Sequence, residues 1–233
     1  MRLVYSNKNL KAAEHKSQLG KKQKYGCRKY NKNRRKNFKW LPEMLESEEE
    51  IPTWSSEVCD YARGVYNEGY GPEAEPLATH TREVIFVKAP ECGYPYVIAV
   101  DTMVAEEERT FESVWHYDIK DDLKINGNIL TCSDMTTILL GEVGTLSVVK
   151  GQEEPFVQGI ICRSTTQGDY EGIPTLLRDN RGKNVRIATI FAPTGGEECA
   201  IGEAIFDVNM ITIVYKNGKS NTFEVDKIAK MAK

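Results

Sequence analysis

The sequence predicts an all-β protein, an antiparallel β-sandwich that follows a basic, disordered N-terminal tail. Ten or more short apolar runs, rich in Val, Ile, Phe and Tyr, begin near residue 60 and continue almost to the C-terminus. Gly, Pro, Asn-Gly or charged turns separate these runs, which is the pattern of consecutive antiparallel strands. No convincing long helical pattern interrupts them. Short strands at this spacing are typical of a two-sheet sandwich.

The first 40 residues differ sharply in composition from the rest. They hold 14 of the 31 Lys and Arg residues but one of the 34 Asp and Glu, which leaves 17 bases and 33 acids in the other 193 residues. Such a segment buries too little apolar surface to offset the entropy of ordering, so we expect residues 1–40 to be disordered. Binding of a nucleic-acid backbone by these bases is the alternative. Residues 41–59 are acidic, and the helical spacing of Leu41, Met44 and Leu45 supports a short helix or a linker there.

The beginning of the sandwich is predicted from three apolar runs behind a Tyr- and Gly-rich segment. This segment covers residues 60–71, and the runs cover 80–88, 96–101 and 114–118. A turn at Pro90–Gly93 joins the first two runs, and a charged link around Glu106–Glu108 joins the second to the third. We expect an antiparallel meander.

Further strands are expected along the rest of the chain. The candidates are 123–125, 129–130, 137–140, 146–149, 157–162, 185–191, 211–215 and 222–225. The pairs Asn126-Gly127 and Asn217-Gly218 mark tight turns, and residues 164–182 are expected to form a loop. The domain organisation is therefore a tail and linker at 1–56, a sandwich domain at 57–226 and a C-terminal tail at 227–233.

Several functional classes find no support in the sequence. It contains no run near the ~18 apolar residues of a membrane span and no secretory signal. The usual nucleophile, phosphate-binding and dinucleotide-binding motifs are absent, and acidic pairs such as Asp121-Asp122 resemble solvated turns. The six cysteines include no Cys-x-x-Cys pair, so we expect buried thiols rather than a disulfide framework or a thiolate zinc site. No catalytic residue is assigned.

Three side chains of the meander form a candidate metal site. If tight turns lie at Pro90–Gly93 and at Glu106–Arg109, then His80 and Asp101 lie on one face within two positions of direct opposition. The same holds for Asp101 and His116. Two imidazoles and a carboxylate can hold zinc with water as the fourth ligand. We therefore predict a structural zinc at His80, Asp101 and His116; alternatively, Asp101 caps a turn and the histidines make local hydrogen bonds.

Several of these segments resemble the β-sheet domain of the heparinase II/III-like polysaccharide lyases. They are Tyr61-Ala-Arg-Gly-Val-Tyr-Asn-Glu-Gly-Tyr70, His80-Thr-Arg-Glu-Val-Ile-Phe-Val-Lys88, Tyr96-Val-Ile-Ala-Val-Asp101, Trp115-His116 and Arg186-Ile-Ala-Thr-Ile-Phe-Ala-Pro193. The resemblance spans about residues 57–225. It implies the lyase type of supersandwich, and it agrees with a His/Asp/His metal site in this part of the sheet.

The resemblance also implies a function. Members of the family join an α-helical toroid to the sandwich and cleave uronic-acid polysaccharides by β-elimination, in which a Tyr or His removes the proton beside the uronate carboxylate. This chain is then expected to be the C-terminal sandwich of such a lyase, inactive without the missing α-helical domain. An acidic polysaccharide would be bound through the parent enzyme, which would be periplasmic or secreted. No membrane contact is expected.

Two other functions stay open at this stage. One is a non-catalytic carbohydrate- or protein-binding sandwich in which aromatic side chains stack on a ligand. The candidates are Trp54, Tyr66, Tyr70, Tyr94 and Tyr96, for which cross-strand packing is the plain alternative. The other is a nucleic-acid binder that uses the basic tail, which the acidic body makes the least favoured.

Overall fold

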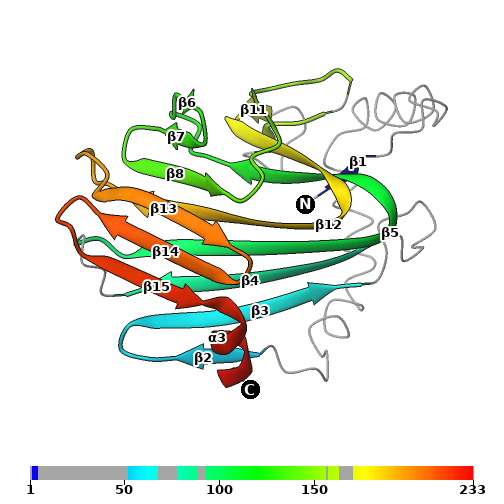
Figure 1. Cartoon of the computed structure of the whole chain (residues 1–233). Coiled ribbons are helices and arrows are strands. Elements are labelled where there is room, and N and C mark those ends of the chain that lie inside the picture. Colours follow the sequence, from blue (N-terminus) through cyan, green and yellow to red (C-terminus); the bar gives the residue numbers. More distant parts are fainter. Residues whose placement is uncertain are drawn as a thin grey trace, which may run out of the picture.

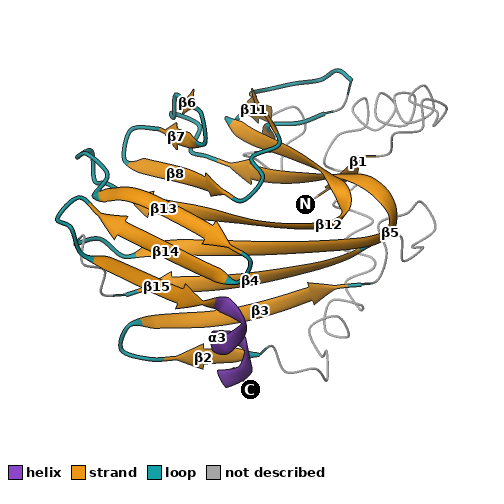
Figure 2. Ribbon diagram, in the orientation of Figure 1, coloured by secondary structure: helices purple, strands orange, loops and turns teal. Residues whose placement is uncertain are grey.

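The computed structural model of the chain describes residues 2–4, 52–67, 78–88, 93–155, 157–162 and 170–232. The predictions made for residues 5–51, for Tyr70 and for the loop at Pro90 lie outside these residues. Residues 2–4, expected to belong to the disordered tail, instead form a strand paired with residues 110–112. The described part is built of antiparallel strands with one short helix, as Figure 2 shows. This confirms the predicted all-β sandwich. None of the described helical residues forms a helix long and apolar enough to cross a membrane.

Most strands belong to one ten-stranded sheet, and the C-terminal strands form a smaller one. The large sheet has the order β2 (Thr53–Ser55), β3 (Cys59–Tyr66), β4 (Thr79–Val87), β5 (Tyr96–His116), β12 (Thr175–Pro193), β8 (Met135–Leu140), β7 (Ile129–Thr131) and β6 (Lys124–Asn126), with β1 (Arg2–Val4) paired to β5 and β9 (Thr145–Val149) paired to β12. The small sheet contains β13 (Ile201–Asp207), β14 (Met210–Tyr215) and β15 (Ser220–Glu224), and helix α3 (Val225–Met231) follows it. A separate pair is formed by β10 (Ile160–Cys162) and β11 (Tyr170–Gly172).

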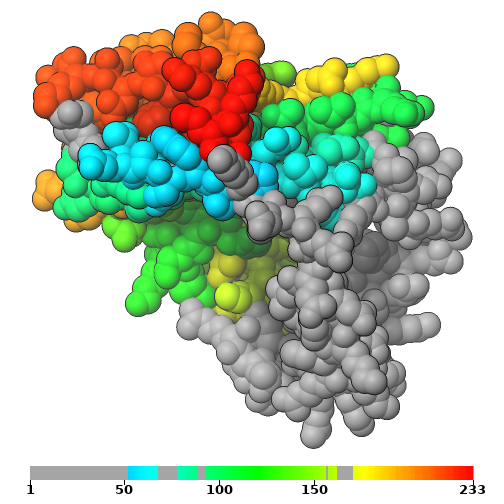
Figure 3. Space-filling model, turned by 90° about the horizontal axis from the view of Figure 1, so that it is seen from below, coloured from blue at the N-terminus to red at the C-terminus, as the bar shows by residue number. Residues whose placement is uncertain are grey.

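The main hydrophobic core lies between the large sheet and the layer formed by β13–β15 and α3. Along β5, Tyr96, Ile98 and Val100 alternate into this core, as a strand with one buried face requires. From β14, Ile211 and Tyr215 meet them; the Tyr215 and Tyr96 hydroxyl oxygens are 2.7 Å apart. The small sheet and α3 cover this face in Figure 1, and they pack against β2 and β3 in Figure 3.

A second hydrophobic layer forms on the opposite face, because the paired strands β5 and β12 bend back over the large sheet (Figure 1). The pairing shifts between Gly182 and Asn184, where β5 has more residues than β12. Beyond the bend, Phe111 packs in the same cluster as Met103 of its own strand. The predicted turn at Glu106–Arg109 is therefore wrong: the charged residues lie at the bend of one continuous 21-residue strand.

Other segments also differ from the sequence predictions. Residues 175–182 were expected to form a loop, but they form the first half of β12. The prediction failed because Arg178 and Asn180 are buried polar side chains, which interrupt the apolar pattern of a buried strand. Strand β13 was not predicted. Residues 227–231, expected as tail, form most of α3, which buries Ile228 in the main core.

Two local features agree closely with the sequence. Thr79 pairs with Val104 and Val87 with Tyr96 along β4 and β5, which is the register set by a hairpin centred between residues 91 and 92. The β6–β7 hairpin forms beside Gly127, whose φ of 61° suits a tight turn. Both features depend on contacts between neighbouring segments, which is why sequence pattern alone predicts them.

The connection between β8 and β9 yields a first prediction. Gly144 has a φ of 70°, and a Cβ placed there would lie 2.1 Å from the carbonyl oxygen of Asp179. We expect Gly144→Ala to lower the free energy of unfolding by about 3 kcal/mol, because a left-handed backbone costs about 1–2 kcal/mol and the clash adds to it. Urea unfolding at neutral pH measures the loss.

Gly127→Ala is the matched control for this prediction. Gly127 has a φ of 61°, but a Cβ there meets no atom within 4 Å. Its loss should be only about 1 kcal/mol, the backbone cost alone. Equal losses in the two variants would show that the contact with Asp179 is unimportant.

Candidate functional site

A buried polar cluster of His80, Arg82 and Asp101 lies on the face of the large sheet opposite the small sheet. Arg82 and Asp101 are direct partners across β4 and β5, and His80 lies two residues along β4. The His80 Nε2 atom is 2.6 Å from Asp101 Oδ1. Arg82 donates from Nε to Oδ1 at 2.7 Å and from Nη2 to Oδ2 at 3.0 Å. We call these residues the His80–Arg82–Asp101 cluster.

The electrostatics of the cluster favour an ionised aspartate. The Asp101 side chain is fully buried, and burial by itself would raise the pKa of its carboxyl. Hydrogen bonds from His80 and Arg82, together with the charge of the guanidinium, outweigh burial and hold the pKa of Asp101 below its ordinary value. A two-pronged arginine–carboxylate pair of this kind is also geometrically rigid.

Aromatic side chains surround the exposed part of this cluster. The Arg82 guanidinium carbon lies 4.3 Å from the centroid of the Trp115 ring, and Trp115 packs edge-on against Phe191 with ring centroids 4.7 Å apart. Trp115 comes from the half of β5 that bends back over the sheet. Tyr66 of β3 is the cross-strand partner of His80 and is 41% exposed. The cluster is thus bordered by one stacked and one exposed aromatic ring.

The structure brings together two of the three predicted zinc ligands. His80 and Asp101 are in contact, but His116 is exposed at the far end of β5, opposite Thr175 of β12. The turn expected to bring His116 to Asp101 does not exist. Zinc sites use three or four protein ligands, and His80 with Asp101 supplies only two. As arranged, these residues do not fit a zinc ion.

The aromatic residues proposed as stacking platforms fall into different environments. Tyr96 is 1% exposed and belongs to the main core, so that interpretation is wrong for this residue. Trp54 is partly buried and packs on the same core. Tyr66 and Tyr94 are 41% and 50% exposed.

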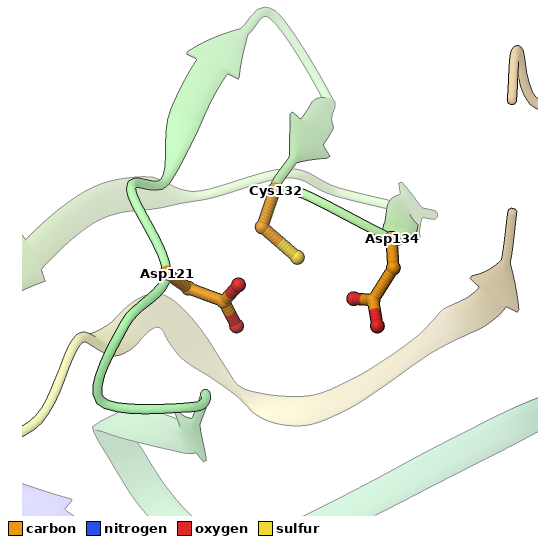
Figure 4. Close-up of side chains that lie close together, drawn as sticks. All are labelled: Asp121, Cys132 and Asp134. Carbon is orange, nitrogen blue, oxygen red and sulfur yellow. The ribbon is translucent and has the colours of Figure 1, made fainter. Parts of the chain in front are cut away.

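A different group of metal-type ligands lies in loops at one end of the large sheet. Asp121 follows β5, while Cys132 and Asp134 form the turn between β7 and β8 (Figure 4). One ligand atom from each lies within 4.8 Å of the others, the one such set of three among the described residues. Burial raises the pKa of the Cys132 thiol. The sequence analysis missed the group because the pair Asp121-Asp122 was interpreted as part of a solvated turn. The Cys132-Ser133-Asp134 spacing was the feature that could have indicated metal ligands.

Three of the described cysteines are free thiols, and one of them is buried as expected. Cys59 is buried, and Cys132 and Cys199 are partly buried. The last two line a groove of about 580 Å³ between the β7–β8 strands and the edge of β13. Its charged lining is Glu197, Glu198 and Glu203 against Lys216, which is paired with Glu198 at 2.5 Å. An acidic lining would repel an anionic ligand, so we do not assign this groove to an acidic polysaccharide.

Comparison with known proteins shows a similarity in structure only. No protein-family model matches the sequence, and no curated protein matches it. The crystal structure of a mutant of heparan sulfate lyase HepC from Pedobacter heparinus is similar over 76% of this chain and 27% of that one, with a TM-score of 0.54 and 14% identity. A heparinase III gene product is similar over 75% of this chain and 27% of that one, with a TM-score of 0.50 and 18% identity.

These identities are low, so the comparison concerns the fold. The chain spans about a quarter of the length of the lyases that it matches. The resemblance read from the strand motifs is confirmed at that level, including the expectation that it covers only part of a lyase. The described strands have a fold in common with part of a heparan sulfate lyase.

Proposed function

We propose that this chain is the β-sandwich portion of a polysaccharide lyase for uronic-acid glycans and that it does not catalyse β-elimination by itself. The observation that carries the proposal is the fold shared with heparan sulfate lyases over three quarters of the chain but only 27% of theirs. The base that removes the proton would belong to an α-helical domain. A periplasmic or secreted setting goes with such an enzyme.

The His80–Arg82–Asp101 cluster supports contact with an acidic sugar. Arg82 is held in place by Asp101 and by the Trp115 ring, and its side chain is 30% exposed. Its hydrogen bonds to Asp101 use Nε and Nη2, so within the described residues Nη1 can donate to a ligand carboxylate or sulfate. Tyr66 adds an exposed ring that can stack on the apolar face of a sugar. The sandwich would form one wall of a polysaccharide cleft.

The proposal predicts binding of an acidic polysaccharide without turnover. The full chain, incubated with heparan sulfate, should produce no ultraviolet-absorbing unsaturated product, yet heparan sulfate should retard it in affinity electrophoresis while dextran does not. Tyr66→Ala should weaken this binding by roughly fivefold, because a stacked ring contributes about 1 kcal/mol. Turnover by the chain alone, or equal retardation by both polymers, would contradict the proposal.

Tyr170→Ala is the matched control, because Tyr170 is 47% exposed but lies in the separate β10–β11 pair. Its affinity for heparan sulfate should equal that of the unmodified chain. A loss in both variants would place the binding elsewhere. The second candidate function is a non-catalytic carbohydrate-binding sandwich, which rests on the exposed rings of Tyr66 and Tyr94. This function would be favoured if dextran retarded the unmodified chain and did not retard Tyr94→Ala.

A further inference from the structure

We propose that Asp121, Cys132 and Asp134 bind a zinc ion, which links the loop after β5 to the β7–β8 turn. This inference does not depend on the proposed lyase function, because the three residues lie apart from the His80–Arg82–Asp101 cluster. The metal would have three protein ligands and one position open to water. It would join two chain segments that meet at the end of the large sheet where β6, β7 and β8 lie (Figure 1).

The donor atoms select the class of metal. A cysteine sulfur beside two carboxylates suits zinc, which takes thiolate, imidazole and carboxylate ligands. Calcium and magnesium use oxygen ligands, so the sulfur disfavours both. Three protein ligands leave a fourth tetrahedral position for water. The chemistry of the set therefore indicates a borderline-soft divalent cation.

The distances are compatible with a tetrahedral ion. The three ligand atoms lie within 4.8 Å of one another. Ligand atoms around zinc lie about 3.5 Å apart, given bonds of about 2.0–2.3 Å. Side-chain rotations that move these atoms by about 1 Å would bring them to the spacing found around zinc. Figure 4 shows the three side chains gathered around one space.

The backbone under the set is held by hydrogen bonds. Cys132 N donates to the Met135 carbonyl at 3.0 Å, which closes the turn, and Thr194 N donates to the Asp134 carbonyl at 2.6 Å. Asp121 is oriented separately: Oδ2 accepts from Asp118 N and Oδ1 accepts from Ser133 Oγ, both at 3.0 Å. Hydrogen bonds that orient ligands in this way are typical of metal sites.

The charge balance of the group also favours a cation. In the part of the chain that the structure describes, no Lys, Arg or His forms a salt bridge with Asp121 or Asp134. Other carboxylates there do have such a partner, for example Asp60 with Lys88 and Glu108 with Arg181. Two neighbouring carboxylates without a base repel each other, and a divalent ion would neutralise both.

The test is zinc binding to the full chain, first freed of metal with a chelator. We expect one zinc ion per chain by equilibrium dialysis and a higher unfolding temperature with zinc than without it. Cobalt should give a thiolate-to-cobalt charge-transfer band, which reports the sulfur ligand directly. Calcium should bind much more weakly than zinc. Absence of zinc binding, or of the cobalt band, would overturn the proposal.

Variants locate the ion. Cys132→Ser and Asp121→Asn change few atoms, and each should weaken zinc binding by about 100-fold while circular dichroism stays unchanged. Cys199→Ser, in the adjoining groove, should keep the affinity and the cobalt band, and so should His116→Ala. If His116→Ala removed zinc while Cys132→Ser kept it, the ion would belong to the ligand set predicted from the sequence, and this proposal would be wrong.

Discussion

Arg178→Ala should lower the free energy of unfolding by about 4 kcal/mol, one of the two largest losses that we expect from a single substitution in this chain. Arg178 is fully buried, although arginine is almost never buried without partners. Its guanidinium donates to four backbone carbonyls, those of Leu140, Glu142, Val143 and Ala188, at 2.7–3.1 Å. One side chain on the bent-back half of β12 thus holds the end of β8, the connection after it and the other half of its own strand.

The size of the effect follows from two opposing terms. A buried guanidinium costs desolvation free energy, and this burial lowers the pKa of Arg178 to about 10; its removal recovers that cost. Against this, each buried carbonyl left without a donor costs about 1–3 kcal/mol. The Glu142 carbonyl keeps a donor in Asn180 Nδ2, but the carbonyls of Leu140, Val143 and Ala188 lose theirs, so the second term is larger. Arg178→Met keeps most of the volume but not the donors and should lose nearly as much, which separates hydrogen bonding from packing.

The comparison residue is Arg181, three positions along the same strand. Its side chain is 71% exposed and forms a surface pair with Glu108 at 2.8 Å. Exposed pairs contribute about 0–1 kcal/mol, so Arg181→Ala should change stability by no more than about 0.5 kcal/mol. Urea unfolding of all three variants at neutral pH provides the measurement. A loss below about 1 kcal/mol for Arg178→Ala would mean that water or backbone movement satisfies the carbonyls.

The parts of the fold that the sequence predicted are those set by near neighbours. The β4–β5 register follows from one short hairpin, and the alternation of Tyr96, Ile98 and Val100 shows directly which face of β5 is buried. The first half of β12 was mistaken for a loop because buried Arg178 and Asn180 interrupt its apolar pattern. Both side chains donate to backbone carbonyls 38 residues away in the sequence, and such contacts cannot be read from neighbouring residues.

The candidate sites also divide into contacts set by one hairpin, which the sequence predicts, and contacts set by the whole sheet, which it does not. His80 and Asp101 are in contact because the register of the β4–β5 hairpin places them two positions apart on one face, and this pairing was predictable. His116 was misplaced because an acidic stretch, Glu106–Glu108, is compatible with a turn and equally with a solvent-exposed bend in a long strand. The zinc group proposed at Cys132 joins two loops whose meeting depends on the order of strands in the completed sheet. Neither pattern nor spacing shows that order.

Asp101→Ala should destabilise the protein by about 3–5 kcal/mol at neutral pH. The substitution leaves His80, a buried residue, and the partly buried Arg82 without their shared carboxylate, and breaking a buried ion pair from one side costs about this much. Asp101→Asn, which keeps the shape but not the charge, should lose about 2 kcal/mol. Asp60→Asn is the matched control, because Asp60 also has a cationic partner, Lys88, but is exposed to solvent, and we expect little change.

The pH dependence of the same variants tests the electrostatic cause. The folded pKa of Asp101 lies below the ordinary value of about 3.9 that the unfolded chain retains. Its contribution to stability is therefore fully present above about pH 4–5 and is lost as the pH falls through the folded pKa, where the unfolded state binds the extra proton. Stability measured from pH 7 to pH 3 should fall less steeply in Asp101→Asn than in the unmodified chain. Parallel curves would show that the buried carboxylate is not held ionised by His80 and Arg82, and the rigid presentation of Arg82 to a ligand would then lose its physical basis.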